Sequence, residues 1–389
     1  MRNFKNWLDG YLEYTKGSEP LPIFHKWVGI SLLAAAVERK VWLVWDEPTY
    51  VNFYIVIVAP SGSRKGTALR FGRDLLSEID VKLSSDATTR RALTSALERS
   101  VSLMDTPDGQ VPHSSLTVYS EEFTVFLGYD NRQLLSYLCD WYDCRDPWEY
   151  STEHSGCNYI RNVWVNIIGA TTPTLLQDTL ISSAIGGGLT SRMIFIYGGG
   201  KGKIVVFPFL EKVDLEFREA LVSDLREINH LSGEMIPSQD FLELWEEWYP
   251  KQCENPPFTD PRFGGYLDRR AKHVLKISML LSVAESNELE VKASHLKRGI
   301  KMLEEAEVDM RKALGGAGTS PISVQVESVY NLLVEQGEMT YKELFSLIHH
   351  DLDKDGLDKV LTNLVVLGKV RFERDNEKPF ELRKIIPVM

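Results

Sequence analysis

The residues best suited to chemistry form the loop from Ala59 to Thr67, which lies between an apolar run and a helical pattern. A lysine-bearing, glycine-rich loop in that setting binds phosphate, because its backbone N–H groups and the next helix N-terminus surround the phosphate oxygens. Lys65 would reach the β- and γ-phosphates as a point charge. An ordinary turn with a solvated lysine is the alternative interpretation. The residues expected to bind the nucleotide are Ser61, Gly62, Ser63, Arg64, Lys65, Gly66 and Thr67.

The loop departs from the usual pattern G-x-x-x-x-G-K-[ST] at three positions. Ala59 replaces the first glycine, Arg64 replaces the second, and Gly66 stands where the Mg²⁺-binding hydroxyl is expected. Thr67 lies one residue later and is predicted to supply that hydroxyl as a metal ligand. These departures bear on the rate of hydrolysis more than on nucleotide binding.

Two carboxylates, Glu121 and Glu122, follow the apolar run from Leu116 to Ser120. An acidic pair at the end of a buried strand suits nucleotide hydrolysis. Glu121 would orient Mg²⁺ through water, and Glu122 would polarise the attacking water. Both are therefore predicted to be catalytic, with Glu121 also a metal ligand. A solvated start of a loop is the alternative.

A third apolar run, Val163 to Ile168, leads to the hydroxyls of Thr171 and Thr172. At this place an ATPase with an additional strand has a polar sensor of the γ-phosphate, and Thr172 is predicted to have that catalytic role. Either threonine could equally cap the helix that begins after Pro173.

Two arginines are candidates for stabilising charge on the phosphates. Arg192 follows the glycines Gly186 to Gly188 and precedes the apolar run from Met193 to Tyr197. In ring ATPases such an arginine enters the site of the neighbouring subunit. A further pair, Arg269 and Arg270, opens a long helical segment, where a second sensor would face the nucleotide. The alternatives are a surface ion pair and a solvated helix face.

The segment from Glu149 to Ile160 is expected to form two strands around a Ser-Gly turn. In a ring motor a hairpin at this point would project into the central channel, where side chains contact nucleic acid by stacking or charge. An ordinary edge hairpin is the alternative. The candidates for nucleic-acid contact are Arg145, Trp148, His154 and Arg161.

Buried strands that alternate with helices must position these residues. Between residues 49 and 212 this alternation predicts a parallel sheet in an α/β P-loop NTPase core. Residues 1–48 are predicted to be helical, and residues 213–314 have the helical spacing of a lid or subdomain. The predicted strands are Phe53 to Val58, Leu116 to Ser120, Val163 to Ile168 and Met193 to Tyr197.

A glycine- and serine-rich linker is predicted at residues 315–320, and a separate domain is predicted at residues 321–389. Three helices followed by a β-hairpin predict a winged-helix domain. Its third helix carries aspartates beside lysines, so a protein contact is at least as good an expectation as DNA reading. The predicted helices are 323–335, 340–348 and 354–367, and the predicted strands are 369–373 and 380–383.

Composition limits the classes of protein. A net charge of -11 over 389 residues argues against coating nucleic acid with bulk positive charge, but not against holding DNA in a narrow channel. The four cysteines lack the spacing of a zinc site. We expect no membrane span and no export signal, and hence a cytoplasmic protein, in the bacterial host if it is phage-encoded.

Three segments resemble phage- and plasmid-encoded P-loop ATPases described as primase-helicase-like or of unknown function. They are Tyr11 to Pro20, Leu33 to Val41 and Arg64 to Thr67. The resemblance covers about residues 10 to 290 and implies a RecA/AAA+-type core with a helicase-like role in replication of a mobile element. By motif position it carries over Lys65, Glu122, Thr172 and Arg192.

The leading hypothesis is an ATP- and Mg²⁺-dependent motor on single-stranded or forked DNA, assembled as a homo-oligomeric ring, expected to be a hexamer. A primase or other replication proteins are the expected partners. The alternatives are a nucleotide-switched loader or adaptor, and a packaging or defence ATPase. No metal-ligand cluster for an attached nuclease or primase is found in the sequence.

Overall fold

The computed structural model divides the chain into two compact units, Met1–Leu314 and Gly315–Met389, which are described separately. The predicted linker lies outside the described residues. The structure describes residues 2–84, 89–106, 109–128, 131–152, 156–180, 188–207, 214–314, 321–373, 379 and 382–388.

A five-stranded sheet forms the centre of the first unit, in the order β4-β5-β8-β3-β9. Strands β5, β8, β3 and β9 are parallel, and β4 runs antiparallel to β5. The chain is therefore a mixed α/β protein with a mainly parallel sheet, as the sequence predicts. The bounds are β3 Tyr54–Val58, β4 Val101–Thr106, β5 Gly109–Ser120, β8 Val163–Thr171 and β9 Met193–Tyr197.

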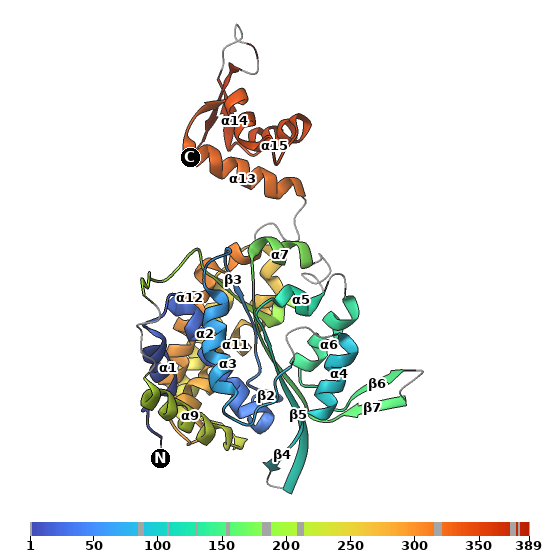
Figure 1. The fold of residues 1–389 in the computed structure, drawn as a ribbon, viewed down its shortest axis with the longest axis vertical. Coiled ribbons are helices and arrows are strands. Elements are labelled where there is room, and N and C mark those ends of the chain that lie inside the picture. Colours follow the sequence, from blue (N-terminus) through green and yellow to red (C-terminus); the bar gives the residue numbers. More distant parts are fainter. Residues whose placement is uncertain are drawn as a thin grey trace. The chain divides into compact units, whose positions relative to one another are not determined.

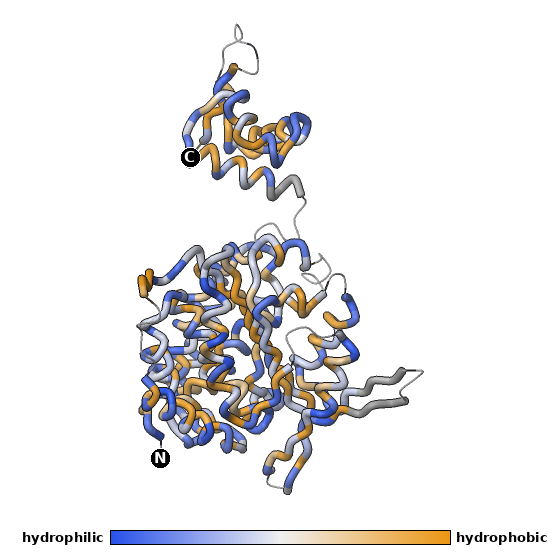
Figure 2. Tube along the Cα trace, viewed as in Figure 1, coloured by the Kyte–Doolittle hydropathy of each residue, from blue (hydrophilic) through white to orange (hydrophobic). Residues whose placement is uncertain are grey.

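Helices cover both faces of this sheet (Figure 1). Helices α2 (Pro22–Val37) and α3 (Lys65–Leu76) lie on one side, where the Tyr119 hydroxyl of β5 donates to Leu69 O at 2.6 Å. Helices α4 (Arg90–Arg99), α5 (Phe123–Leu127) and α6 (Arg132–Tyr142) lie on the other side. All residues of β3 and β8 are buried, which explains their continuous apolar sequence. Figure 2 shows these strands as an apolar centre.

The strand order places β8 between β3 and β5, although β8 follows both in the sequence. The edge of β5 away from β8 pairs with β4 and, further along, with Leu83, which forms a parallel bridge to Thr117. Because parallel strands end at the same edge of a sheet, residues 59, 121 and 172 come to one edge. We call this the carboxyl edge and the opposite one the amino edge.

The predicted helical segment 1–48 is only partly helical. It contains α1 (Trp7–Thr15) and α2, but the chain then forms the antiparallel strands β1 (Val41–Val44) and β2 (Pro48–Tyr50). Helix prediction fails there because the apolar residues of β1 continue the apolar pattern of α2. β1 also pairs with β10 (Gly233–Glu234), which ties this segment to the later helices.

Four longer helices complete the first unit: α9 (Leu215–Asn229), α10 (Gln239–Glu254), α11 (Gly264–Glu285) and α12 (Ala293–Leu314). A short sheet of β11 (Ile236–Pro237) and β12 (Glu290–Val291) joins their connections. The N-terminal segment packs on this group, and the Trp7 indole donates to Leu221 O at 2.9 Å. No helix in the described ranges is long and apolar enough to cross a bilayer.

The hairpin expected from Glu149 to Ile160 is present as β6 (Trp148–Thr152) paired antiparallel with β7 (Gly156–Ile160). It extends away from the body of the unit (Figure 1). Because β7 leads directly into β8, the hairpin begins at the amino edge.

The second unit has its own apolar core, which includes Leu333, Leu357 and Ile385. Its three helices are followed by β14 (Val370–Phe372) and β15 (Lys384–Pro387), and β15 also pairs with β13 (Met339–Thr340). The second strand lies later than the predicted 380–383. The helices are α13 (Pro321–Gln336), α14 (Tyr341–Ile348) and α15 (Lys354–Val366).

Candidate functional site

The loop after β3 is held in a defined shape. Gly62 has φ +82° and Arg64 has φ +59°, so two loop residues adopt left-handed backbone conformations. The buried Ser63 hydroxyl donates to Pro60 O at 2.7 Å, and the Ala59 N–H donates to Thr171 O at 3.2 Å. The loop is thus closed on itself and fastened to the end of β8.

Helix α3 begins at Lys65 without a capping side chain, because its N-cap residue is Arg64. The first N–H groups of a helix have no partner within the helix and carry partial positive charge. In this structure they are directed to the carboxyl edge of the sheet, where an anion would meet them.

The Lys65 ammonium folds back over the loop and donates to Ala59 O at 2.8 Å and to Pro60 O at 3.0 Å. Burial lowers the pKa of Lys65, and the nearby Glu122 carboxylate opposes this shift. The lysine and the acidic strand end are therefore close enough to interact, as predicted from their order in the sequence. A phosphate would offer Lys65 a charged partner in place of two neutral carbonyls.

Glu121 lies against the first turn of α3. A Cβ added at Gly66 would be 2.7 Å from Glu121 Oε2, and the Arg70 Nε is 3.6 Å from Glu121 Oε1. Glu122 is exposed and precedes α5, and its backbone carbonyl accepts from Val125 N at 3.0 Å. The structure thus brings both predicted carboxylates to the Lys65 loop and the start of α3.

The two threonines after β8 differ in their contacts. The buried Thr171 pairs through its backbone with the loop strand, opposite Val58. Thr172 is the N-cap of α7 (Pro173–Thr179), and its hydroxyl accepts from Leu175 N at 3.4 Å. Thr172 is therefore the capping residue, a role that the sequence had left open to either threonine. Among the residues that the structure describes, none accepts the hydroxyl proton of Thr172.

Arg192 and Arg269 do not lie with Lys65. Arg192 directly precedes β9 and is thus at the amino edge, where its Nε is 3.2 Å from Asp143 Oδ1. Arg269 Nη1 is 3.4 Å from the same carboxylate oxygen. Arg269 therefore lies at the amino edge, away from the Lys65 loop, because α11 begins against the residues before β9. Gly186 and Gly187 lie outside the described residues.

A buried polar network surrounds these arginines at the amino edge. Burial raises the pKa of Asp143, but its hydrogen bond to Arg192 and the charges of both arginines lower it overall. The buried Lys276 ammonium donates to Asn52 O at 3.1 Å, and burial lowers the pKa of Lys276 to about 7. These groups hold α6, β3 and α11 together.

The predicted nucleic-acid contacts have different environments. Arg145 is mostly exposed but pairs with Asp140 at 3.1 Å, and Arg161 is exposed. Trp148 is only 7% exposed, and its ring packs against Trp141, with centroids 5.3 Å apart. The indole of Trp148 is therefore not available to stack on a base, contrary to the prediction. His154 lies outside the described residues.

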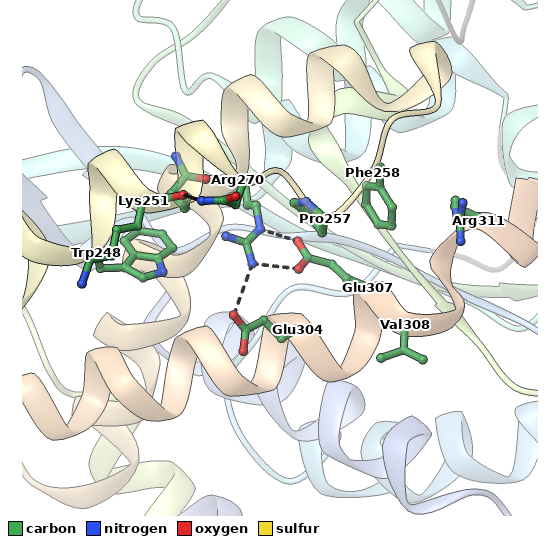
Figure 3. A pocket seen from close by; sticks show the side chains of 11 residues that line it. Trp248, Lys251, Pro257, Phe258, Arg270, Glu304, Glu307, Val308 and Arg311 are labelled. Carbon is green, nitrogen blue, oxygen red and sulfur yellow. Dashed lines mark hydrogen bonds and ion pairs between the residues drawn. The ribbon is translucent and has the colours of Figure 1, made fainter.

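A separate cavity of about 540 Å³ lies among α10, α11 and α12. Figure 3 shows the Arg270 guanidinium at its centre, with Trp248 beside it. The pair of Arg270 Nε and Glu307 Oε1, at 2.7 Å, is buried and is shared with the Tyr266 hydroxyl, which donates to Glu307 at 2.8 Å. None of the predicted loop residues lines this cavity.

Within the described ranges, no group of three or more His, Cys, Asp or Glu side chains could hold a metal ion. Glu121 supplies a carboxylate beside the loop. The half-buried Thr67 follows Gly66 in the first turn of α3.

Three residues of this arrangement were missed by the sequence analysis: Glu19, Arg70 and Asp143. The Glu19 carboxylate pairs with the Arg64 guanidinium and accepts from Val205 N at 3.4 Å. Because Arg64 stands where the loop pattern has a glycine, its positive charge could have indicated an acidic partner nearby. Nothing in the sequence indicates which of 55 acidic residues provides it.

Comparison of the sequence with models of protein families gives no match, and comparison with curated proteins gives no significant relative.

Proposed function

We propose that the chain binds ATP with Mg²⁺ at the carboxyl edge of its sheet and acts as a P-loop ATPase. One observation carries this proposal: the strand order brings the Lys65 loop, two carboxylates and the threonine end of β8 to one edge. Ligands of open parallel sheets bind beyond the carboxyl ends of the strands, where the strand order reverses. An additional strand between the loop strand and the acidic strand is also what the predicted class requires.

The residues would divide the work as follows. The first N–H groups of α3 and the Lys65 ammonium bind phosphate oxygens, with Lys65 leaving the two carbonyls that it now contacts. Glu122 polarises the attacking water, and the free hydroxyl proton of Thr172 donates to a phosphate oxygen. Glu121 and Thr67 would hold Mg²⁺, which neutralises charge on the β- and γ-phosphates.

We further propose that the ATPase is a ring-forming motor on single-stranded or forked DNA, in a mobile genetic element. Two features at the amino edge support this proposal. Arg192 is far from the loop of its own chain and is paired with Asp143, so it would have to leave this pair to stabilise phosphate charge in a neighbouring subunit. The β6–β7 hairpin projects from the same edge and provides a means of touching a strand in a channel.

ATP turnover with and without single-stranded DNA, and separation of a forked duplex, test this function. We expect DNA to stimulate the wild type, and Lys65→Ala to lower ATP affinity at least 100-fold and abolish turnover. Lys301→Ala, which changes an exposed lysine of α12, is the matched control and should behave as the wild type. Full ATPase activity in Lys65→Ala would refute the site, and turnover indifferent to DNA would refute the motor.

A second function, a nucleotide-switched loader or adaptor, is favoured by the departures in the loop. Arg64 adopts a left-handed conformation where glycine is usual, and Gly66 carries no hydroxyl. In that case ATP binds tightly but turns over slowly, and Glu122→Gln leaves the affinity and the assembled state unchanged. Single-turnover measurements on Glu122→Gln separate the loader from the motor, because the motor loses hydrolysis with this change.

A further inference from the structure

Gly66 and Glu121 fit together in a way that the loop pattern alone does not show. A Cβ at position 66 would be 2.7 Å from Glu121 Oε2, a distance that real Cβ atoms essentially never have. The next nearest atoms are further away, with the Arg70 Nη2 at 3.8 Å. The missing side chain at position 66 therefore provides the space that the carboxylate occupies.

The Glu121 carboxylate also differs chemically from the hydroxyl that the usual loop has at this position. In the usual loop, the residue after the lysine supplies a hydroxyl oxygen to Mg²⁺. Apart from residues 65 and 67 and the backbone of α3, the atom nearest to a Cβ at that position is a carboxylate oxygen, and a carboxylate is a better ligand for a hard cation than a neutral hydroxyl. Arg70, one turn further along the same face of α3, has its Nε 3.6 Å from Glu121 Oε1.

Thr67 is a poorer replacement for the missing hydroxyl. Consecutive residues of an α-helix point about 100° apart, so the side chain of Thr67 leaves the helix in a different direction from that of position 66. The Glu121 carboxylate reaches position 66 itself.

We propose that Gly66 is a specificity-determining position, whose lack of a side chain lets Glu121 replace the loop hydroxyl as a direct ligand of the nucleotide-bound Mg²⁺. This inference rests on the proposed binding of a nucleotide at the loop. It has an unusual consequence, because restoring the standard residue should impair the site.

Gly66→Ser tests the inference. The atom that the new Cβ meets is the end of a flexible side chain, so the protein should fold with its usual melting temperature while the carboxylate is displaced. We expect the Mg²⁺ concentration for half-maximal binding of a fluorescent ATP analogue to rise about tenfold. Nucleotide binding in EDTA should be unchanged.

Three further variants complete the experiment. Gly264→Ser, at the start of α11 in open space, is the matched control and should leave Mg²⁺ dependence unchanged. Glu121→Gln should raise the Mg²⁺ requirement as Gly66→Ser does. Gly66→Ser combined with Glu121→Asp should recover part of the loss, because the shorter carboxylate makes room for the serine. Electron paramagnetic resonance of Mn²⁺ with ATP gives an independent measure of metal binding.

The outcomes separate the two proposals. If the wild type binds ATP but Gly66→Ser has an equal or lower Mg²⁺ requirement, Glu121 does not replace the loop hydroxyl as a Mg²⁺ ligand. The proposed nucleotide site is then unaffected. If the wild type binds no nucleotide, with or without Mg²⁺, both proposals are wrong.

Discussion

The charged side chains at the two edges of the central sheet differ in the partners that they have. At the amino edge, Asp143 is shared by Arg192 and Arg269, and Lys276 is enclosed by hydrogen bonds. At the carboxyl edge, the hydrogen-bond partners of the Lys65 ammonium within the described ranges are two carbonyls, and Glu122 is exposed.

Under the proposed function, the carboxyl edge is the one that receives a ligand. Charges that already have strong partners hold elements together, whereas charges with weak partners gain most from an incoming ion. Substitutions at the amino edge should therefore reduce stability, and substitutions at the carboxyl edge should reduce binding with little loss of stability.

Asp143→Ala should have the largest effect on stability, because it leaves Arg192, only 11% exposed, without its carboxylate. We expect the free energy of unfolding to fall by about 3 kcal/mol, measured by urea denaturation. Asp140→Ala is the control: its partner Arg145 is 67% exposed, so the loss should stay below about 1 kcal/mol. Equal losses for the two variants would remove the distinction between the edges.

Acid should weaken the amino edge through His273. Burial, with the charges of Lys276 and Arg269, lowers the pKa of His273 to about 3. Between this value and the ordinary 6.5, the unfolded chain binds a proton that the folded chain refuses, so stability falls as the pH drops below about 6.5. At pH 5 this loss amounts to about 2 kcal/mol.

The measurement compares denaturation at pH 7 and pH 5 for the wild type and His273→Phe, and the variant should lose less stability between the two. Other buried histidines also contribute to the slope, since burial lowers the pKa of His25 to about 4. His25 lies away from the amino edge, so the difference between wild type and His273→Phe isolates His273. An unchanged slope in His273→Phe would contradict the prediction.

Gly62→Ala should have the smallest effect on stability. Gly62 has φ +82° and no atom within 4 Å of an added Cβ, so the cost is backbone strain alone, about 1 kcal/mol. Urea denaturation should show this loss together with a larger change in ATP affinity. The opposite pattern, a large loss of stability with normal ATP affinity, would show that the loop is a structural turn.

The sequence predicted the elements whose pattern is local. The strand Met193–Tyr197 was predicted at its observed bounds, because its residues form a continuous apolar run flanked by polar residues. The strand β4 and the first half of β5 were missed, since residues such as His113 and Ser114 interrupt any apolar run. These two segments are stabilised by pairing with each other, a contact that periodicity does not reveal.

The candidate site was also predictable only in part, because contacts between residues far apart in the sequence leave no local pattern. The grouping of Lys65, Glu121, Glu122 and Thr172 could be predicted, because these residues follow parallel strands that end at one edge. The partners of the arginines do not follow from the sequence, because Asp143 is 49 residues from Arg192 and 126 from Arg269. Long-range ion pairs leave no periodic signal, so the sequence did not place Arg269 at the amino edge.

Glu19 bears on how the chain reaches this structure during synthesis. Its carboxylate contacts Arg64 and the N–H of Val205, which is 186 residues further along the chain. A ribosome makes the protein from the N-terminus, and contacts of long sequence separation form late. The Lys65 loop is therefore translated early but cannot gain its full set of contacts until more than half of the 389 residues have been made.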